Sequence, residues 1–323
     1  MGDAQRIPVR QLGPGGPDVP LFGLGSWNTW DRMEFDDAVA LARRAAAAGA
    51  TLFDVAHYNF GPHAEQARTD IIFGEVVRAA GIAREDYHLC GKLWLWEYPT
   101  TTFDSQMTTS LERIGVERAD SVVVGDYMSP PDIPAVVTDV NEQIAKGRFA
   151  VWGVNNWIAS DLEAALAFAD REGLVGPTFA QLKYSIARRT MAEGPFYAPY
   201  FADGRLALQA SDVFEGGILA GRKFPERKIG ADPGGIRDTI REAADAVAEI
   251  AARYGATAAQ VAIAFCLTNP AVANVLFGVS RIEQLEDNLG AIELAAEHGA
   301  ELHAALDPLW SDKAVNADGS WSL

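Results

Sequence analysis

The sequence has little that would indicate an exported, metal-binding or membrane-embedded protein. It contains two cysteines, Cys90 and Cys266, and five histidines in 323 residues. Both cysteines lie in apolar runs, which favours core positions over a disulfide, and the histidines show no metal-ligand spacing. No apolar run approaches the ~20 residues of a membrane-spanning helix, and residues 1–16 lack the apolar core of a signal peptide. We therefore expect a cytoplasmic protein without a bound metal.

Basic residues are also scarce. The chain has 27 Lys and Arg against 44 Asp and Glu, a formal net charge of −17. This charge repels nucleic acids and anionic membrane surfaces, so we expect a small-molecule partner instead. It also makes any basic residue beside a glycine turn informative, because a phosphate-bearing ligand would need local positive charge. The oligomeric state is left open.

Short apolar runs alternate with amphipathic segments along the whole chain. Strands of four to seven residues that alternate with longer helices indicate parallel βα units. Eight such units without a break in composition predict a single α/β domain over 1–323, a (β/α)₈ TIM barrel rather than an open sheet. The expected strands are 19–25, 51–54, 87–92, 120–125, 149–154, 179–182, 206–210 and 275–277, and the expected helices are 37–50, 69–80, 103–114, 133–146, 160–172, 237–254, 258–267 and 283–294.

Some local signals refine this outline. Gly49 and Gly81 are expected to end the first two helices, and Ser160 with Glu163 forms a possible capping box. The segment 223–235, rich in Gly, Pro and basic residues, is long for a βα connection and is interpreted as a lid. The aromatic tail 303–323 is either a disordered end or a flap across the barrel mouth, and the cost of exposing its tryptophans favours the flap.

Polar side chains follow two successive expected strands. Asp54 ends the second strand, with Tyr58 on the turn after it, and Lys92 ends the third. The active sites of such barrels lie at the carboxyl ends of the strands. A lysine ammonium beside a tyrosine stabilises the phenolate, and an aspartate holds the lysine charged, so the three could transfer a proton to a carbonyl oxygen. The alternative is structural: Asp54 caps the turn, Tyr58 packs on it, and Lys92 is a solvated strand end.

A second candidate site follows the eighth strand. Gly278 allows close approach of an anion, and Ser280, Arg281 and a helix N-terminus could bind a phosphate. Barrels of this kind often bind phosphate near strands seven and eight. A capped helix with an incidental arginine is the alternative. Polar residues continue along the first turns of this helix at Gln284, Asp287 and Asn288.

Tryptophans gather on the turns after strands one, three and five. They predict an aromatic pocket for a ring-bearing or sugar substrate, although some of them could simply cover the barrel end. The pocket candidates are Trp27, Trp30, Trp94, Trp96 and Trp157.

Five motifs together resemble the aldo-keto reductase superfamily, nearest to its bacterial and potassium-channel β-subunit-like branch. They are FD at 53–54, GKLW at 91–94, the stretch 147–157 ending in GVNNW, GGILAGR at 216–222 and GVSRIEQLEDNL at 278–289. The resemblance spans residues 19 to about 294. It implies a barrel that binds NADPH across its C-terminal face and reduces aldehydes and ketones, with Asp54, Tyr58 and Lys92 as catalytic residues.

The resemblance also implies a set of cofactor contacts. Asn156 and Gln181 would hold the nicotinamide carboxamide, and Arg222 with the basic lid would cover the pyrophosphate. The adenosine 2′-phosphate would lie against the residues at 280–288. The full set of expected NADP(H)-binding residues is Ser26, Trp27, Asn156, Gln181, Ser211, Phe214, Gly217, Arg222, Gly278, Ser280, Arg281, Gln284, Asp287 and Asn288.

The reaction centre departs from the family pattern. Gly125 occupies the position of the catalytic histidine and is followed by Asp126, which we assign to the substrate pocket. Tyr58 follows Asp54 by four residues instead of five, so Asn59 stands in the usual tyrosine position. Losing one positioned acid or orienting group typically costs ~10²–10⁴ in rate.

Two further replacements lie nearby. Asn155 stands where the family has a serine, and Ser211, beside Asp212, stands where an aromatic normally stacks on the nicotinamide. His57 or His63 could line the pocket and take over the orienting role, although each could instead pack on its turn.

These observations favour an NADPH-dependent carbonyl reductase with Tyr58 as proton donor. Two alternatives remain. One is an NADP(H)-binding barrel with different chemistry, such as another redox step, an elimination or an epimerisation. The other is a nucleotide-sensing module without catalysis, which retention of Asp54 and Lys92 disfavours.

Overall fold

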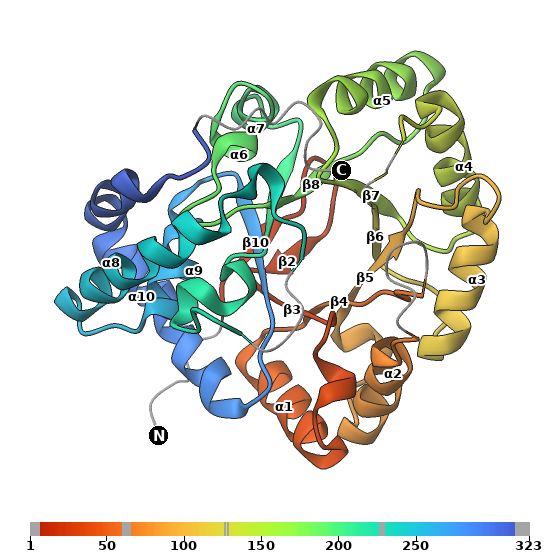
Figure 1. Ribbon diagram of the computed structural model, residues 1–323. Coiled ribbons are helices and arrows are strands. Elements are labelled where there is room, and N and C mark those ends of the chain that lie inside the picture. The colour runs from red at the N-terminus through yellow and green to blue at the C-terminus, as the bar shows by residue number, and fades with distance from the viewer. Residues whose placement is uncertain (1–6, 60–65, 126, 128, 226–229, 314–323) are drawn as a thin grey trace.

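The computed structural model describes residues 7–59, 66–125, 127, 129–225 and 230–313. Eight parallel strands close into a barrel in the order β10, β3, β4, β5, β6, β7, β8, β9, with helices around the outside (Figure 1). The predicted (β/α)₈ barrel is therefore confirmed. The barrel strands are β3 (Phe22–Gly25), β4 (Leu52–Asp54), β5 (His88–Leu93), β6 (Ser121–Val124), β7 (Val151–Asn155), β8 (Phe179–Lys183), β9 (Ala207–Ser211) and β10 (Val272–Phe277).

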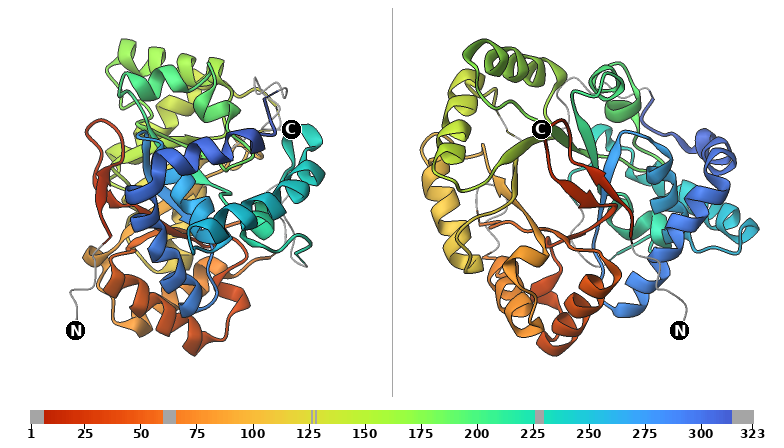
Figure 2. Two further views of the ribbon diagram at one scale, coloured as in Figure 1. Left: turned by 90° about the vertical axis from the view of Figure 1, so that its left-hand side faces the viewer. Right: turned by 180° about the vertical axis from the view of Figure 1, so that it is seen from behind.

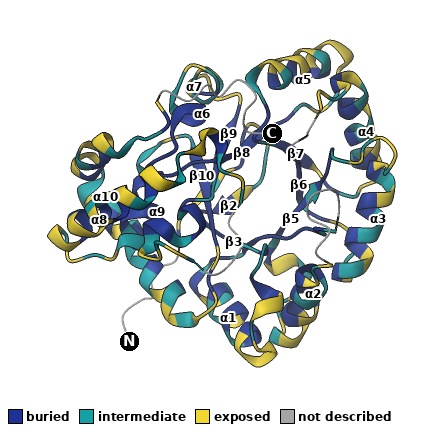
Figure 3. Cartoon of the chain, in the orientation of Figure 1, coloured by how far each residue is buried: buried dark blue, intermediate teal, exposed yellow. Residues whose placement is uncertain are grey.

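The helices bury the side that faces the strands and expose the other side to solvent (Figure 3). Gly49 and Gly81 end α1 and α2 in the left-handed conformation, as predicted. Both cysteines are buried and free, in agreement with the expected core positions. The helices are α1 (Phe35–Ala48), α2 (Thr69–Ala80), α3 (Phe103–Ile114), α4 (Ile133–Ala145), α5 (Ala159–Glu172), α6 (Thr190–Glu193), α7 (Ala198–Ala202), α8 (Arg237–Arg253), α9 (Ala258–Thr268) and α10 (Ile282–Leu306).

The first expected strand, 19–25, is in fact two. Strand β2 (Asp18–Pro20) pairs antiparallel with β1 (Val9–Gln11) as a hairpin, and β3 begins after it and joins the barrel. The hairpin crosses the barrel on the side seen from behind (Figure 2). Antiparallel pairing with β1 ends the first run at Pro20, because the next residues pair with β4 and β10 instead.

Two helices have boundaries that differ from the predicted ones. Helix α5 begins after Ile158, which has no side-chain cap bond, so the capping box at Ser160 is wrong. A complete capping box instead opens α9, between Thr257 and Gln260. Helix α10 continues twelve residues beyond the predicted end at 294, because Leu302 and Leu306 are buried and extend its packing.

The described part of the tail packs on the protein instead of leaving it. The indole of Trp310 donates to Asp312, and the guanidinium of Arg189 lies 5.6 Å from its ring centroid. Asp312 also accepts bonds from the backbone at the start of α6. As far as residue 313 the tail is not part of the cavity described below, and Trp321 lies outside the described residues.

No single helix in the described ranges is long and apolar enough to cross a membrane. Helices α8 and α9 together have the length and composition of a membrane span, but they are bent by 88° at the break between them.

Candidate active site

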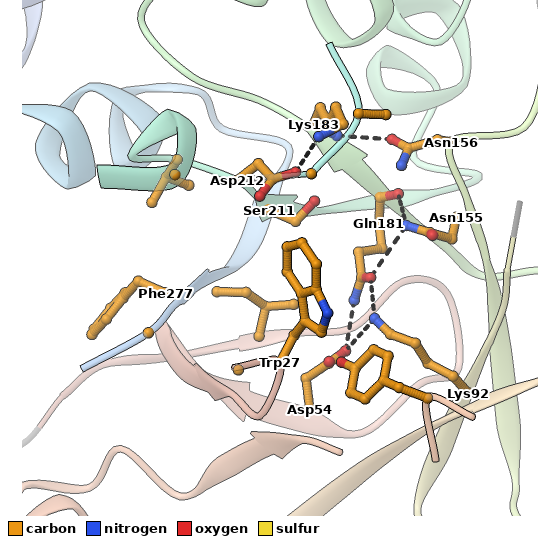
Figure 4. A pocket seen from close by; sticks show the side chains of 18 of the residues that line it. Trp27, Asp54, Lys92, Asn155, Asn156, Gln181, Lys183, Ser211, Asp212 and Phe277 are labelled. Carbon is orange, nitrogen blue, oxygen red and sulfur yellow. Dashed lines mark hydrogen bonds and ion pairs between the residues drawn. The ribbon is translucent and has the colours of Figure 1, made fainter. Parts of the chain in front are cut away.

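One cavity of about 250 Å³ opens at the carboxyl ends of the barrel strands. The site in Figure 4 is built from the ends of several strands and the loops after them. It gathers side chains that are far apart in the sequence, as expected for a parallel barrel. The sequence-predicted residues that line it are Trp27, Asp54, Tyr58, Lys92, Trp94, Trp96, Asn156, Gln181, Ser211, Phe214 and Gly278.

Asp54 and Lys92 form a buried ion pair in the lining of this cavity. The Lys92 Nζ atom lies 3.1 Å from Asp54 Oδ2, and their side chains are 9% and 5% exposed. Strands β4 and β5 are hydrogen-bonded neighbours, which brings their ends together. Burial acts against the Lys92 ammonium, but the negative charge of Asp54 and its hydrogen bond outweigh that effect and raise the pKa of Lys92 above its ordinary value. The lysine is therefore held in its charged form.

Tyr58 lies beside this pair and is itself buried, with 6% of its surface exposed. Burial raises the pKa of Tyr58 above its ordinary value, and the Lys92 ammonium, which lowers it, offsets only part of that shift. The lysine acts in the direction predicted from sequence, but the net direction is opposite because desolvation of the phenolate is the larger effect. The phenol is consequently a protonated group at neutral pH.

Beside Gly125, where the family resemblance implies a histidine, the space for a side chain is filled by an indole. A Cβ atom built on Gly125 would lie 2.6 Å from Cε3 of Trp94. The Trp94 indole N–H donates to the carbonyl of His57 at 2.9 Å, and its ring stacks on Trp96 with centroids 4.3 Å apart. The Gln106 side chain bonds both the N–H and the C=O of Trp94. Trp94 is thus held from several sides and forms an aromatic wall.

His57 does not take over the missing role by facing the cavity. Its Nδ1 atom lies 3.4 Å from Asp70 Oδ2, and Arg113 binds both oxygens of the same carboxylate. Among the residues described by the structure, the cavity lining does not include His57. The prediction that His57 lines the pocket is therefore wrong, because its ring lies against the buried carboxylate of Asp70 on α2. The other two candidates, His63 and Asp126, lie outside the described residues.

Trp30 and Trp157 belong to the core, contrary to the predicted pocket role. Both are completely buried. Trp30 packs against Phe53 and Phe73, and the Trp157 indole donates to the carbonyl of Gly125 at 2.9 Å. Both indoles are therefore surrounded by protein and do not reach the cavity. Neither is found among the described residues that line the cavity.

At the expected nicotinamide end, the polar groups are held in fixed positions. Asn156 has a φ of 52°, and its Oδ1 accepts from the backbone N–H of Lys183. The Ser211 hydroxyl donates to the carbonyl of Leu182 at 2.9 Å. Ser26, which was expected to bind the cofactor, is fully buried, and its carbonyl accepts from Thr69 Oγ1. Ser26 is not among the described residues that line the cavity.

At the expected adenine end, Ser280 and Arg281 are exposed immediately before the long helix α10. The Gln284 side chain accepts a bond from the Ser280 backbone N–H at 2.9 Å and fixes the turn. An exposed guanidinium at the N-terminus of a helix is well suited to a phosphate. These residues therefore fit a phosphate group, as the family resemblance implies.

The structure gives less direct support for the other residues expected to hold the cofactor. Asp287 accepts from Thr257 Oγ1 at 2.8 Å, and Asn288 is buried. Arg222 is exposed, and Gly217 has a φ of 106°. Within the described part of the chain, neither Arg222 nor Gly217 lines the cavity.

Sequence reasoning missed Lys183 as a cavity residue. Its side chain is 9% exposed and forms an ion pair with Asp212. In the view of Figure 4 this pair and the Asp54–Lys92 pair lie on opposite sides of Trp27. The signal was available: Lys183 lies two residues after Gln181 on β8, and residues two apart on a strand share a face.

The segment interpreted as a lid lies partly on the cavity. Gly230 and Ala231 line it, and residues 226–229 lie outside the description. Arg188, 1% exposed, pairs with Glu215 and Asp232 and donates to the carbonyl of Pro233 at 2.6 Å. This buried arginine therefore fixes the end of the loop that adjoins the cavity wall.

The protein is a closed parallel barrel with a buried lysine–aspartate pair and a phenol at its strand ends, where the active sites of barrel enzymes lie. The sequence model of the aldo/keto reductase family matches residues 21–307, and the chain belongs to this family of oxidoreductases.

Two curated relatives are named as probable voltage-gated potassium channel subunits beta. The protein from Oryza sativa subsp. japonica is 28% identical over 310 residues, covering 88% of this chain and 91% of the relative. The protein from Arabidopsis thaliana is 26% identical over 311 residues, with the same coverage of 88% and 91%.

Solved structures support the fold. A thermostable aldo-keto reductase in complex with the inhibitor epalrestat matches with a TM-score of 0.72 and 22% identity, covering 94% of this chain and 100% of that one. A putative 2,5-diketo-D-gluconic acid reductase B matches with a TM-score of 0.72 and 20% identity, covering 98% and 96%. At these identities the likeness concerns the fold alone.

Proposed function

We propose that this protein is an NADP(H)-dependent oxidoreductase that reduces an aldehyde or ketone, with Tyr58 as the proton donor. The observation that carries the proposal is the buried Asp54–Lys92 ion pair, which lines one cavity together with Tyr58. Membership of an oxidoreductase family supports the reaction class. The stacked indoles of Trp94 and Trp96 favour a ring-bearing or sugar carbonyl as the small-molecule substrate. We place this activity in the cytoplasm.

The cofactor would be held at two ends of the site. Ser280, Arg281 and Gln284 would bind its adenosine phosphate, and Asn156 and Ser211 would lie at its nicotinamide end. NADPH, when bound, supplies the hydride. The chain itself supplies the proton, a fixed orientation and the cavity at the strand ends.

The proton moves from the Tyr58 hydroxyl to the carbonyl oxygen of the substrate. Burial keeps this phenol protonated at neutral pH, so it is in the correct state to donate. The Lys92 ammonium then stabilises the phenolate that remains, and Asp54 keeps that ammonium charged and in place. The same three groups therefore prepare the donor and stabilise the charge that develops as it acts.

A two-stage experiment tests the proposal. NADPH is first titrated while tryptophan fluorescence is followed, because Trp27, Trp94 and Trp96 line the cavity. A panel of carbonyl compounds is then screened at the NADPH absorbance. Tyr58→Phe should keep NADPH binding and lose about 10²-fold or more of the turnover. Tyr87→Phe is the matched control, since Tyr87 is equally buried, at 6% exposed, but packs in the core against Phe53. Unchanged turnover of Tyr58→Phe removes Tyr58 from the donor role.

A second candidate is a nucleotide-binding module with altered or absent chemistry. It is favoured by the indole of Trp94, which fills the position of the family histidine, and by the two relatives named as potassium channel subunits. This candidate predicts NADPH binding without carbonyl turnover in the wild-type protein. Binding with a different product would instead indicate another redox step, an elimination or an epimerisation.

A further inference from the structure

Three side-chain amides form a continuous row down the interior of the barrel, starting at Lys92. The Lys92 ammonium donates to Gln181 Oε1 at 2.7 Å. Gln181 Nε2 donates to Gln209 Oε1 at 2.8 Å, and Gln209 Nε2 donates to Asn274 Oδ1 at 3.3 Å. Asn274 Nδ2 donates to the backbone carbonyl of Pro20 at 2.6 Å. Each amide belongs to one of the adjacent strands β8, β9 and β10 and is at most 2% exposed.

The direction of this row is fixed at both ends. An ammonium can only donate a hydrogen bond, and a backbone carbonyl can only accept one. The amide oxygens must therefore face Lys92, and the amide NH₂ groups must face Pro20. Turning any one amide would place two donors or two acceptors against each other, which is costly in a buried site. The row is therefore a set of aligned dipoles with its negative ends toward the lysine.

Two row members and two other side chains together use every hydrogen-bonding position of the Gln181 amide. Its Oε1 accepts from Lys92 and from Asn155, the latter at 3.2 Å. Its Nε2 donates to Gln209 and to Asp54, each at 2.8 Å. The amide thus joins both members of the buried ion pair. This placement differs from the carboxamide contact that the family resemblance implies for Gln181.

We propose that Gln209 and Asn274 are positioning residues for the proton-transfer site. They act through Gln181, whose amide they hold with its oxygen on Lys92 and one N–H on Asp54. Aligned hydrogen bonds polarise one another, so the row stabilises the charged lysine beyond the effect of a single amide. The catalytic consequence rests on the function proposed above, whereas the effect on Lys92 does not.

The first test measures Lys92 directly, in the full-length protein without cofactor. Acetic anhydride reacts only with the neutral amine, so the rate of Lys92 acetylation against pH reports its pKa and is followed by peptide mass spectrometry. Gln209→Met removes the second amide while keeping a similar side-chain length. We expect the Lys92 profile to move to lower pH, with acetylation at a fixed pH about tenfold faster, the ratio that corresponds to one pKa unit.

Two other variants separate this effect from loss of packing. Gln209→Glu can keep both bonds when its buried carboxyl group is protonated, so its Lys92 profile should stay close to wild type. Leu208→Val lies on the same strand and is fully buried, and it should lower stability without moving the Lys92 profile. If Gln209→Met does not fold, Asn274→Ala breaks the row at its far end and should move the profile in the same direction. An unchanged Lys92 profile in folded Gln209→Met and Asn274→Ala overturns the proposal.

Turnover gives the second readout. Gln209→Met and Asn274→Ala should lower kcat for a carbonyl substrate and shift its pH profile, with the KM for NADPH almost unchanged. A wild-type protein that binds NADPH without turnover, combined with a shifted Lys92 profile in Gln209→Met, refutes the proposed reduction and retains the positioning role. The reverse result, normal turnover chemistry with an unchanged Lys92 profile, refutes the positioning role alone.

Discussion

The indole ring of Trp94 stands where a side chain on residue 125 would have to be. A Cβ atom at position 125 would come within 2.6 Å of Trp94 Cε3 and 3.1 Å of Cζ3. An aromatic wall at Trp94 and a side chain at 125 therefore exclude each other in this backbone. The glycine is a packing requirement of the site as well as a departure from the family pattern.

This exclusion predicts coupling between the two positions. Gly125→His should lower the free energy of unfolding by about 1–3 kcal/mol through overpacking, and Trp94→Ala by about 3–5 kcal/mol through a cavity. The double variant should be more stable than the sum of these losses by roughly 0.5–3 kcal/mol, measured by urea unfolding. Gly91→Ala is the control, because its Cβ would find only ordinary contacts of 3.6 Å or more. Additive losses would contradict the coupling.

Lys183 is predicted to act on substrate binding rather than on the proton transfer. It lies one inward-facing position beyond Gln181 on β8, or about 6–7 Å further out along the strand. Lys183→Met should raise the KM for the carbonyl substrate about tenfold and change kcat much less. Lys146→Met is the matched control: Lys146 also pairs with an aspartate, Asp104, but on the surface, where the side chains are 47% and 49% exposed and the pair contributes little. Steady-state kinetics on both variants check this, and equal effects would refute it.

Arg188 should be the most sensitive ion-pair residue for stability. Its side chain is 1% exposed and that of its partner Glu215 is 7% exposed. Burial raises the pKa of Glu215, and the charges of Arg188 and Lys183 oppose that shift. Arg188→Met leaves the carboxyl group buried without its main partner, so we expect a loss of about 3–5 kcal/mol in urea unfolding. Adding Glu215→Gln should recover part of it, and no recovery would show that the charge was not responsible.

Because of His88, we expect the free energy of unfolding to decrease in mild acid. Burial lowers the pKa of His88 to about 4 from its ordinary value of 6.5, while its Nε2 lies 2.7 Å from Ser121 Oγ. Between these values the unfolded chain binds a proton that the folded protein does not, so stability must fall as the pH decreases from 6.5 to 4. His88→Gln cannot titrate but can still bond to Ser121, and its stability should depend less on pH in that window. Thermal unfolding at several pH values measures the difference, and identical slopes would exclude His88 as the cause.

Local patterns in the sequence predict the barrel well, because residues close together in the sequence specify most of its strands and helices. Helices α2 and α3 begin and end at the predicted residues. The end of α10 was missed because packing against the rest of the protein, through Leu302 and Leu306, extends it. The capping box at Ser160 failed for a related reason, since a cap depends on the backbone entering the helix and not on residue spacing alone.

The sequence by itself determined the alternating strands and helices, the two buried cysteines and the family to which the chain belongs. It also brought Asp54 and Lys92 together, because their strands are consecutive in a parallel barrel. Only the tertiary structure decided that Trp94 fills the space beside Gly125, that His57 turns to Asp70, and that Gln181 joins a row of amides. The physical reason is that these arrangements depend on contacts between distant segments, and on which neighbour offers a buried polar group its complementary hydrogen bond.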